Sequence, residues 1–228
     1  MSAATADLSG ALQVARVLRR LRAQVQPGEL GAESVEQFVR RYSRVRAPAL
    51  DLNLRSGGYD PAWPQAFEDE KQRLLTALAG EDVAGVEHIG STAIPQLASK
   101  DILDIVVAMR DPAAIARVAG TLDALGYRAH GESPIDAGFA WHWRIAADGG
   151  RSFVVHTCAA ANPRFAEIKN FRDFLRAFPH ERQRYVELKR ELAAVPDQTW
   201  LEYSALKKIL VVRITAQANA WRAAGGEV

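Results

Sequence analysis

The spacing of hydrophobic residues predicts a block of strands in the middle of the chain, with helices before, between and after them. Apolar, β-branched and aromatic runs predict strands at 86–89, 102–109, 127–129, 139–146 and 151–158. Apolar residues at helical spacing predict helices at 61–78, 112–125, 164–177, 181–194 and 198–221. This order predicts an α+β fold in which helices cover a mixed sheet and the C-terminal half is helical.

The segment LRSGGYDPAWP, residues 54–64, separates this pattern from the N-terminal part of the chain. Its two glycines interrupt regular structure, and Asp60 followed by Pro61 is typical of a helix N-cap and first helical residue. We therefore predict an N-terminal helical arm over 1–55 and a main domain over 56–228.

The N-terminal arm has two helical patterns, at 6–25 and 35–45, and arginines are interleaved with the apolar residues of the first. The apolar positions predict that the arm packs on the main domain or on a second subunit, which would make the protein a homo-oligomer. An arginine-rich face that binds an anionic partner is the alternative.

Composition narrows the class of protein and of partner. The 228 residues carry a formal net charge of +2 at pH 7, which gives no support for nucleic-acid binding, so a small molecule is the expected partner. The single cysteine, Cys158, excludes an internal disulfide and fits a reducing compartment. The start shows no signal-peptide pattern, and no apolar run approaches the ~20 residues that span a bilayer. We therefore expect a soluble cytoplasmic protein with no membrane partner.

One charged residue interrupts the most apolar predicted strand: ILDIVVAM, residues 102–109, contains Asp104. A buried carboxylate is costly unless a metal, a cation or hydrogen-bond donors compensate it. Side-chain alternation places Asp104 and Val106 on one face of this strand and Ile105 on the other. Asp104 is therefore the first candidate for a functional residue.

A Gly-Ser-Thr turn precedes this strand at Gly90, Ser91 and Thr92. Glycine allows the backbone to approach a phosphate closely, and the two hydroxyls supply uncharged donors. A Gly-Ser turn followed about a dozen residues later by a strand aspartate resembles the layout of the nucleotidyltransferase superfamily. In that superfamily the turn holds a triphosphate and strand carboxylates hold Mg²⁺.

The rest of the chain is similar to a narrower group. The run VEHIGSTAIP, the KDILDI that follows, FRDFLRAFPHERQRYVELKRELA at 171–193 and the later pair Tyr203 and Lys207 resemble the GrpB family over about 59–214. The resemblance implies a nucleotidyltransferase-like fold, and some members of the family are fused to dephospho-CoA kinase. The polar positions that match family motifs are His88, Gly90, Ser91, Thr92, Lys100, Asp104, His156, Arg172, Asp173, Tyr185, Lys189, Tyr203 and Lys207.

The chain departs from the family pattern at four positions. Gln96 and Asp101 stand where the family usually has Gly and Pro, beside the predicted phosphate turn. Val106 stands where the superfamily has a second acidic residue, which weakens a two-metal site. Val154 replaces the first histidine of an alternating pair, so that His156 remains alone.

Structural alternatives remain for the main candidates. Asp104 binds a metal or a substrate cation in one interpretation, and forms an ion pair with Lys100, Lys207 or an arginine in the other. His88 either orients the turn or faces the ligand. His156 is a general base or metal ligand, or a buried, hydrogen-bonded histidine.

Two further motifs have open roles. Arg172 is a possible phosphate contact, and we expect no direct pair with the adjacent Asp173, because neighbouring helical residues do not share a face. In the strand motif WHWR, Trp141 lies on the face opposite Arg144. The tryptophans either pack in the core or form an aromatic wall for a planar substrate, with Arg144 nearby.

The leading hypothesis is a Mg²⁺-dependent enzyme that transfers a nucleotidyl group from a nucleoside triphosphate to a small-molecule acceptor. In it, Gly90, Ser91, Thr92 and His88 adjoin the phosphates, and Asp104 holds the metal. Lys100, Arg144, Arg172 or Lys207 offsets phosphate charge, and His156 deprotonates the acceptor. The alternatives are an ATP-dependent small-molecule ligase that uses the same site, and a non-catalytic module that binds a nucleotide or phosphometabolite.

Overall fold

The computed structural model describes residues 37, 58–133, 136–147, 149–193 and 200–228. The chain forms two compact units, one of residues 48–176 and one of residues 1–47 together with 177–228. The predicted helices of the N-terminal arm lie outside the described residues, apart from Gln37, which is helical and exposed. The predicted domain boundary at residue 55 and the side chain of Tyr203 also lie outside them.

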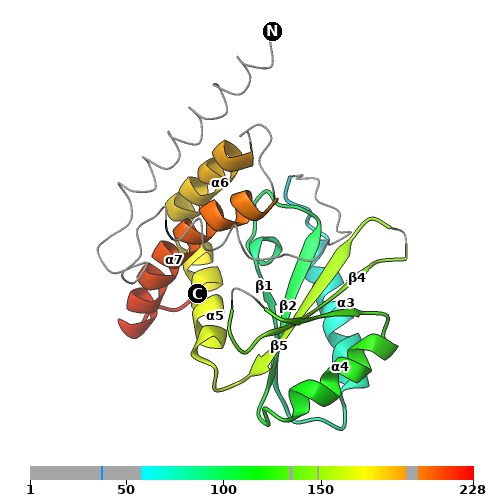
Figure 1. Cartoon of the computed structure of the whole chain (residues 1–228). Helices are drawn as coiled ribbons and strands as arrows, with labels where there is room; N and C mark the ends of the chain where they lie inside the picture. Colours follow the sequence, from blue (N-terminus) through cyan, green and yellow to red (C-terminus); the bar gives the residue numbers. More distant parts are fainter. Residues whose placement is uncertain (1–36, 38–57, 134–135, 148, 194–199) are drawn as a thin grey trace. The chain divides into compact units, whose positions relative to one another are not determined.

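Five strands form one mixed sheet in the first unit, in the order β1-β2-β5-β4-β3 (Figure 1). They are β1 (Val83–Ile89), β2 (Ile102–Met109), β3 (Arg128–Glu132), β4 (Ala140–Ile145) and β5 (Ser152–Ala159). β2 is antiparallel to β1 and parallel to β5, and β4 is antiparallel to both of its neighbours. The strand that carries Asp104 is therefore paired on both edges.

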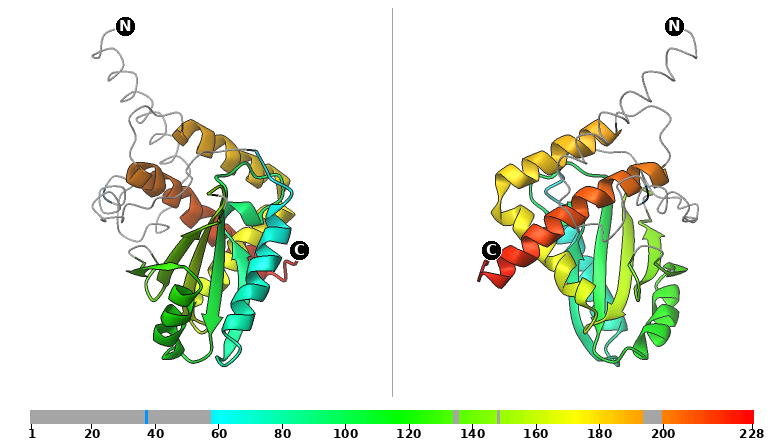
Figure 2. Two further views of the ribbon diagram at one scale, coloured as in Figure 1. Left: turned by 90° about the vertical axis from the view of Figure 1, so that its right-hand side faces the viewer. Right: turned by 60° about the vertical axis from the view of Figure 1, so that its left-hand side comes forward.

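Helices cover both faces of this sheet (Figure 2). On one face α3 (Trp63–Ala77) and α4 (Ala114–Ala124) pack against β2, where Leu103 and Ile105 are fully buried. On the other face α5 (Pro163–Ala177) packs through Phe165 and Ile168 near the buried Val106. Burial on both faces explains why β2 is an almost continuous apolar run. The α+β fold with a helix-covered mixed sheet, predicted from the sequence, is confirmed.

Both α3 and α4 begin two residues later than the Asp-Pro pairs before them predict. The carboxylate of Asp60 accepts a hydrogen bond from the N–H of Ala62 at 2.9 Å, and that of Asp111 accepts one from Ala113 at 2.9 Å. Each aspartate therefore forms a turn that leads into the helix. The prediction that Asp60 is the N-cap of α3 is wrong, because Ala62 occupies that position.

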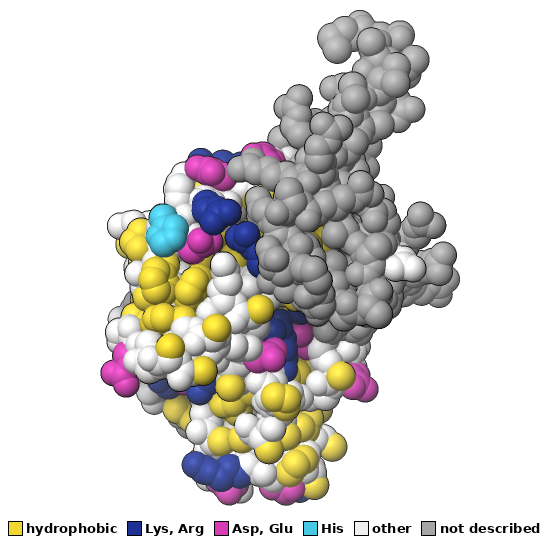
Figure 3. Space-filling view, turned by 90° about the vertical axis from the view of Figure 1, so that its left-hand side faces the viewer, with side chains coloured by type: hydrophobic (Ala, Val, Ile, Leu, Met, Phe, Trp, Pro, Cys, Tyr) yellow, Lys and Arg dark blue, Asp and Glu magenta, His cyan; other side chains and the backbone are white. Residues whose placement is uncertain are grey.

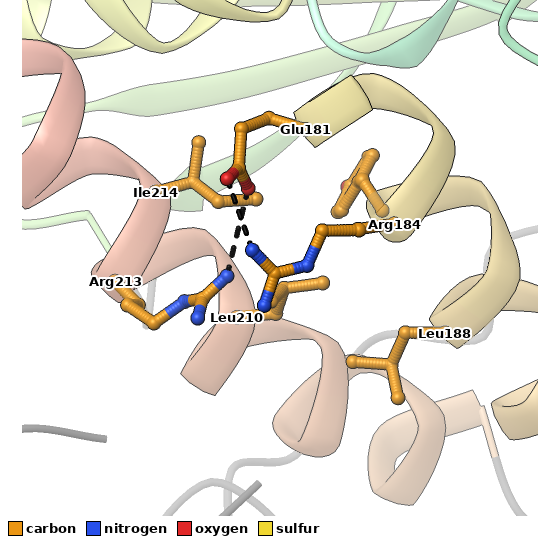
Figure 4. A pocket seen from close by; sticks show the side chains of 7 residues that line it. Glu181, Arg184, Leu188, Leu210, Arg213 and Ile214 are labelled. Carbon is orange, nitrogen blue, oxygen red and sulfur yellow. Dashed lines mark hydrogen bonds and ion pairs between the residues drawn. The ribbon is translucent and has the colours of Figure 1, made fainter. Parts of the chain in front are cut away.

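The described helices of the second unit are α6 (Pro179–Ala193) and α7 (Trp200–Ala223). They lie side by side and form a small pocket (Figure 4), in which Glu181 accepts a hydrogen bond from Arg184 at 3.0 Å. The same carboxylate lies 3.7 Å from Arg213 of α7. Glu181 thus offsets the charge of both arginines, and the pocket offers no simple anion site.

Over the described part of the chain, no helix is both long and apolar enough to cross a membrane.

Gln96 has a positive φ of 64°, a backbone conformation that favours glycine over residues with a Cβ. We expect Gln96→Gly to raise the free energy of unfolding by up to ~1 kcal/mol, since relief of the left-handed conformation exceeds the entropy cost of glycine. Urea denaturation would measure the change. Gln65→Gly, in the exposed face of α3, is the matched control and should be destabilising. A loss of stability in both variants would contradict the expected strain at Gln96.

Candidate functional site

A glycine turn fits closely against the Asp104 carboxylate. The chain leaves β1, turns at Gly90 with φ 70° and ψ −167°, and continues into the short helix η1 (Ser91–Ala93). Side chains with a Cβ are strained in this conformation. A Cβ on Gly90 would lie 3.0 Å from the Cβ and 3.1 Å from the Cγ of Asp104, and closer still to Oδ2. Glycine is therefore required for the backbone of the turn to approach Asp104.

Asp104 pairs with a histidine of the neighbouring parallel strand. Nε2 of His156, on β5, lies 3.2 Å from Oδ1 of Asp104, and the Asp104 side chain is 31% exposed. Among the described residues of the first unit, no lysine or arginine lies within ion-pair distance of Asp104, which disfavours the structural ion pair with Lys100. The partly exposed carboxylate keeps Oδ2, on the side of the Gly90 turn, without a hydrogen-bond partner in the described residues.

The register of the sheet shows what surrounds this pair. Asp104 is opposite Val154 and Val106 is opposite His156 across β2 and β5, so all four side chains share one face. Val106 is fully buried in an apolar cluster at the position of the expected second carboxylate. Glu87 of β1 lies opposite Val106 on the same face, and it was not predicted as a site residue.

His88 lies beneath the turn, on the face of the sheet opposite Asp104. It is buried and stacks on Phe67 of α3, with 4.8 Å between the ring centroids. The Thr92 hydroxyl donates to the Ile102 carbonyl at 3.0 Å, so the hydrogen bond of 3.0 Å between His88 Nε2 and Thr92 requires His88 to be the donor. The polar groups of His88 and Thr92 support the turn, in place of the phosphate contacts predicted for them.

Burial lowers the pKa of His88 from 6.5 to about 4. Below pH 6.5 the unfolded chain therefore binds a proton that the folded protein does not, and the free energy of unfolding should fall as the pH drops from 6.5 to 4. The expected contribution of His88 is roughly 3 kcal/mol over this range. Urea denaturation of wild type and His88→Gln at pH 7.5, 5.5 and 4.5 would measure it. An equally steep loss of stability in the variant would contradict this origin.

Two arginines of α5 hold the turn from the Asp104 face. Arg172 donates to the Glu87 carboxylate at 2.8 Å and to the His88 carbonyl at 3.0 Å. Arg176 donates through Nε and Nη2 to the Ala93 carbonyl, at 3.0 and 2.7 Å. These contacts give Arg172 a role in supporting the turn, and its phosphate contact stays a prediction. Arg176 was missed, although it follows Arg172 by one helical turn.

Arg172 also donates to the adjacent Asp173 at 2.8 Å, so the prediction that these neighbours form no direct pair is wrong. The rule that helical neighbours do not face one another describes their Cβ atoms. The long side chain of arginine folds back along the helix surface and reaches the neighbouring carboxylate.

Arg144 lies on the opposite face of the sheet from Asp104. Its guanidinium donates to the carboxylate of Glu70 on α3, which is only 4% exposed, and stacks 4.2 Å from the ring centroid of Phe153. Burial disfavours its charge, but the hydrogen bond to Glu70 and the electrostatic attraction of Tyr127 and Glu70 together outweigh this and raise the pKa of Arg144. The predicted role of Arg144 beside the phosphates is therefore wrong, because alternate residues of β4 point to opposite faces.

The other residues considered for the site in the sequence analysis lie in different elements of the structure. The carboxylate of Asp101 accepts hydrogen bonds from Arg151 at 2.8 Å and from the indole N–H of Trp63 at 2.7 Å. Ser91 begins η1 directly after Gly90, and Lys100 precedes β2, each partly buried. Lys207 lies on α7 in the second unit. The phosphate contacts of Ser91, Lys100 and Lys207 stay predictions.

The donor atoms on the Asp104 face suit one divalent cation and not two. Mg²⁺ takes oxygen ligands and is commonly held by one or two carboxylates together with substrate phosphates. Asp104 offers Oδ2 for this purpose. Two cations would need further shared carboxylates, but Val106 is apolar, and no group of three His, Cys, Asp or Glu side chains suited to a metal exists among the described residues.

Surface charge is mixed on the face drawn in Figure 3, where acidic and basic side chains lie beside one another with apolar side chains between them. The described part of that face carries no continuous basic field, in keeping with the small net charge of the chain.

The Gly90 turn after β1 is followed by a central strand with a partly exposed carboxylate, in a mixed sheet that helices cover on both faces. The family model described as GrpB protein matches residues 57–217, and the chain belongs to the GrpB family. The solved structure of the conserved protein GrpB from Enterococcus faecalis superimposes with a TM-score of 0.60 and 30% identity. It covers 72% of this chain and 99% of its own.

Curated relatives come from several bacteria. A UPF0157 protein of Deinococcus radiodurans is 37% identical over 160 residues, covering 70% of this chain and 79% of the relative. One from Streptomyces coelicolor is 35% identical over 174 residues, covering 76% and 88%. The match spans only 47% of the Bacillus subtilis relative. It spans 42% of a dephospho-CoA kinase of Mycolicibacterium paratuberculosis, at 30% identity.

Proposed function

We propose that the protein binds a Mg²⁺–nucleoside triphosphate at the Gly90 turn and Asp104, and transfers the nucleotidyl group to a small-molecule acceptor. The acceptor would form a bond to the α-phosphorus while the α–β phosphoanhydride bond breaks and pyrophosphate leaves. The observation that carries this proposal is the close fit of the Gly90 backbone against a partly exposed carboxylate. A turn whose main chain can approach a phosphate, beside a carboxylate that can hold the accompanying cation, is suited to a metal–nucleotide.

The two oxygens of Asp104 have separate roles in this proposal. Oδ1 accepts a hydrogen bond from His156, and Oδ2, nearest to the turn, is the oxygen that would hold Mg²⁺. When bound, the cation would neutralise charge on the phosphates and orient them. Lys100 is proposed to offset the remaining phosphate charge, and Ser91 to donate to a phosphate oxygen.

His156 is proposed to deprotonate the acceptor. While the Nε2–H of His156 donates to Asp104, its Nδ1 carries the lone pair. Nδ1 would therefore take the proton of the attacking group, and the adjacent carboxylate would stabilise the imidazolium that forms. Asp104 thus orients the imidazole as well as holding the cation.

The buried Val106 favours a second candidate, a module that binds the nucleotide or a phosphometabolite without turnover, since a two-metal reaction centre is incomplete. A nucleotide labelled on its α-phosphate separates the candidates. A labelled acceptor supports the transferase, free labelled AMP or ADP supports a ligase, and binding without any product supports the module. The chain matches only 42% of the relative that is named a dephospho-CoA kinase, so kinase activity is not part of the proposal.

Thermal unfolding with a panel of nucleotides, each with and without Mg²⁺, tests the binding step, because a ligand that binds only the folded state raises the melting temperature. We expect a Mg²⁺-dependent rise for wild type that is lost in Asp104→Asn. Asp101→Asn, on the opposite face of the sheet, is the matched control. Its melting temperature without nucleotide should be lower than that of wild type, but the Mg²⁺-dependent rise should remain. If no nucleotide raises the melting temperature of wild type, the proposed function is wrong.

A further inference from the structure

Two tryptophans extend the Asp104 face beyond His156. Trp141 of β4 is opposite His156 of β5, and Trp143 is opposite Val154, so both indoles lie on the same face as Asp104. The indole of Trp141 meets the imidazole of His156 edge to face, with 5.5 Å between the ring centroids. The tryptophans are therefore continuous with the candidate site.

Both indoles have an unsatisfied donor. The Nε1–H groups of Trp141 and Trp143 are buried from solvent and have no hydrogen-bond partner in the part of the chain that the structure describes, and the whole Trp143 residue is only 7% exposed. An indole N–H donates and does not accept. Buried polar groups without a partner are uncommon and costly, and each calls for an explanation such as a missing ligand. A ligand that brings oxygen or nitrogen acceptors would satisfy both donors.

The charge next to the indoles indicates the character of that ligand. The guanidinium of Arg128 on β3 lies 5.5 Å from the ring centroid of Trp143, and Arg128 has no acidic partner within ion-pair distance in the described residues. His130 stacks beside the same indole, with 5.9 Å between ring centroids. Donors and a positive charge exclude a cationic ligand and favour one with oxygen acceptors or a negative charge. The aromatic walls favour a planar one.

We infer that Trp141, Trp143 and Arg128 form the subsite for the acceptor of the reaction, and that this acceptor carries a planar group with oxygen acceptor atoms. The inference rests on the proposed function. Neighbouring strands are about 4.8 Å apart, so β4 lies about 10 Å from β2. A small molecule on the tryptophans would span this distance and bring its attacking group to His156, between β4 and β2.

Isothermal titration with 4-hydroxybenzoate and with its saturated analogue 4-hydroxycyclohexanecarboxylate tests the subsite, and titration with Mg²⁺–ATP is run in parallel. The proteins are wild type, Trp141→Phe, Trp141→Leu and the matched control Trp221→Phe on α7. We expect wild type and the control to bind only the planar probe. Trp141→Phe, which lacks the N–H, should bind it about five- to tenfold more weakly, and Trp141→Leu more weakly still, while Mg²⁺–ATP binding is unchanged.

Three results would overturn the inference. Wild type that binds neither probe, or both probes equally, contradicts a subsite for a planar group. An affinity for the planar probe that is unchanged in both Trp141 variants places it elsewhere. A loss of Mg²⁺–ATP binding in Trp141→Leu, with the folded state intact by circular dichroism, would assign the indoles to the nucleobase. Failure of Mg²⁺–ATP to bind wild type at all counts instead against the proposed function.

Discussion

Gly90→Ala is expected to lower the free energy of unfolding by roughly 2–4 kcal/mol and to abolish nucleotide binding. The turn at Gly90 has φ 70° and ψ −167°, a combination open almost only to glycine. The added methyl group would also collide with the Asp104 side chain. The turn must therefore move away from the carboxylate, and the two parts of the site separate.

Gly120→Ala is the matched control for this prediction. Gly120 lies within α4, and a Cβ there would meet no atom within 4 Å. Alanine should raise the stability at this position by up to ~1 kcal/mol, because it loses less backbone entropy in a helix. Urea denaturation and nucleotide titration of both variants provide the comparison. Unimpaired nucleotide binding in Gly90→Ala would show that the close approach of the turn to Asp104 is not needed.

Glu70→Ala is expected to cost about 3–5 kcal/mol in stability, because it leaves the guanidinium of Arg144 inside the protein without its carboxylate. Glu70 is 4% exposed and also accepts a hydrogen bond of 2.6 Å from the hydroxyl of Tyr127. Burial, together with this carboxylate, raises the pKa of Tyr127. Removing Glu70 therefore leaves two buried donors unpaired at once.

Two comparison variants show whether the loss comes from burial. Glu81→Ala removes an exposed carboxylate from its pair with Arg117 and should change stability little. The double variant Glu70→Leu with Arg144→Met removes both charges and should recover much of the lost stability. If the double variant were as unstable as Glu70→Ala, the uncompensated charge of Arg144 would not be the cause.

Local patterns of apolar residues were sufficient to predict most of the helices and strands. The bounds of β2 agree with the sequence prediction, because a continuous apolar run has few alternatives once its length suits a strand. β1 begins three residues earlier than predicted. Its pairing with β2 is irregular between Val83 and Gly85, and Gly85 interrupts the run of apolar residues from which the strand was predicted. Periodicity alone does not reveal such irregular ends.

The site was predictable in part. The turn and Asp104 are local features, and strand alternation correctly placed Asp104 and Val106 on one face. The face of Arg144 relative to Asp104 depends on how β4 pairs with β5, and a single sequence does not specify that register. The contact of Arg172 with Glu87 joins residues 85 positions apart, so it could not be predicted from local sequence patterns either.

Binding of Mn²⁺, used in place of Mg²⁺ and followed by electron paramagnetic resonance, tests the central claim most directly, because it reports the cation itself. The wild-type protein with a non-hydrolysable nucleotide is expected to bind one Mn²⁺ more tightly than the nucleotide alone does. Asp104→Asn should lose this extra affinity by at least about tenfold, since the only carboxylate proposed to hold the cation is gone. Equal Mn²⁺ affinity in the wild type and the variant would contradict a cation–nucleotide site at Asp104.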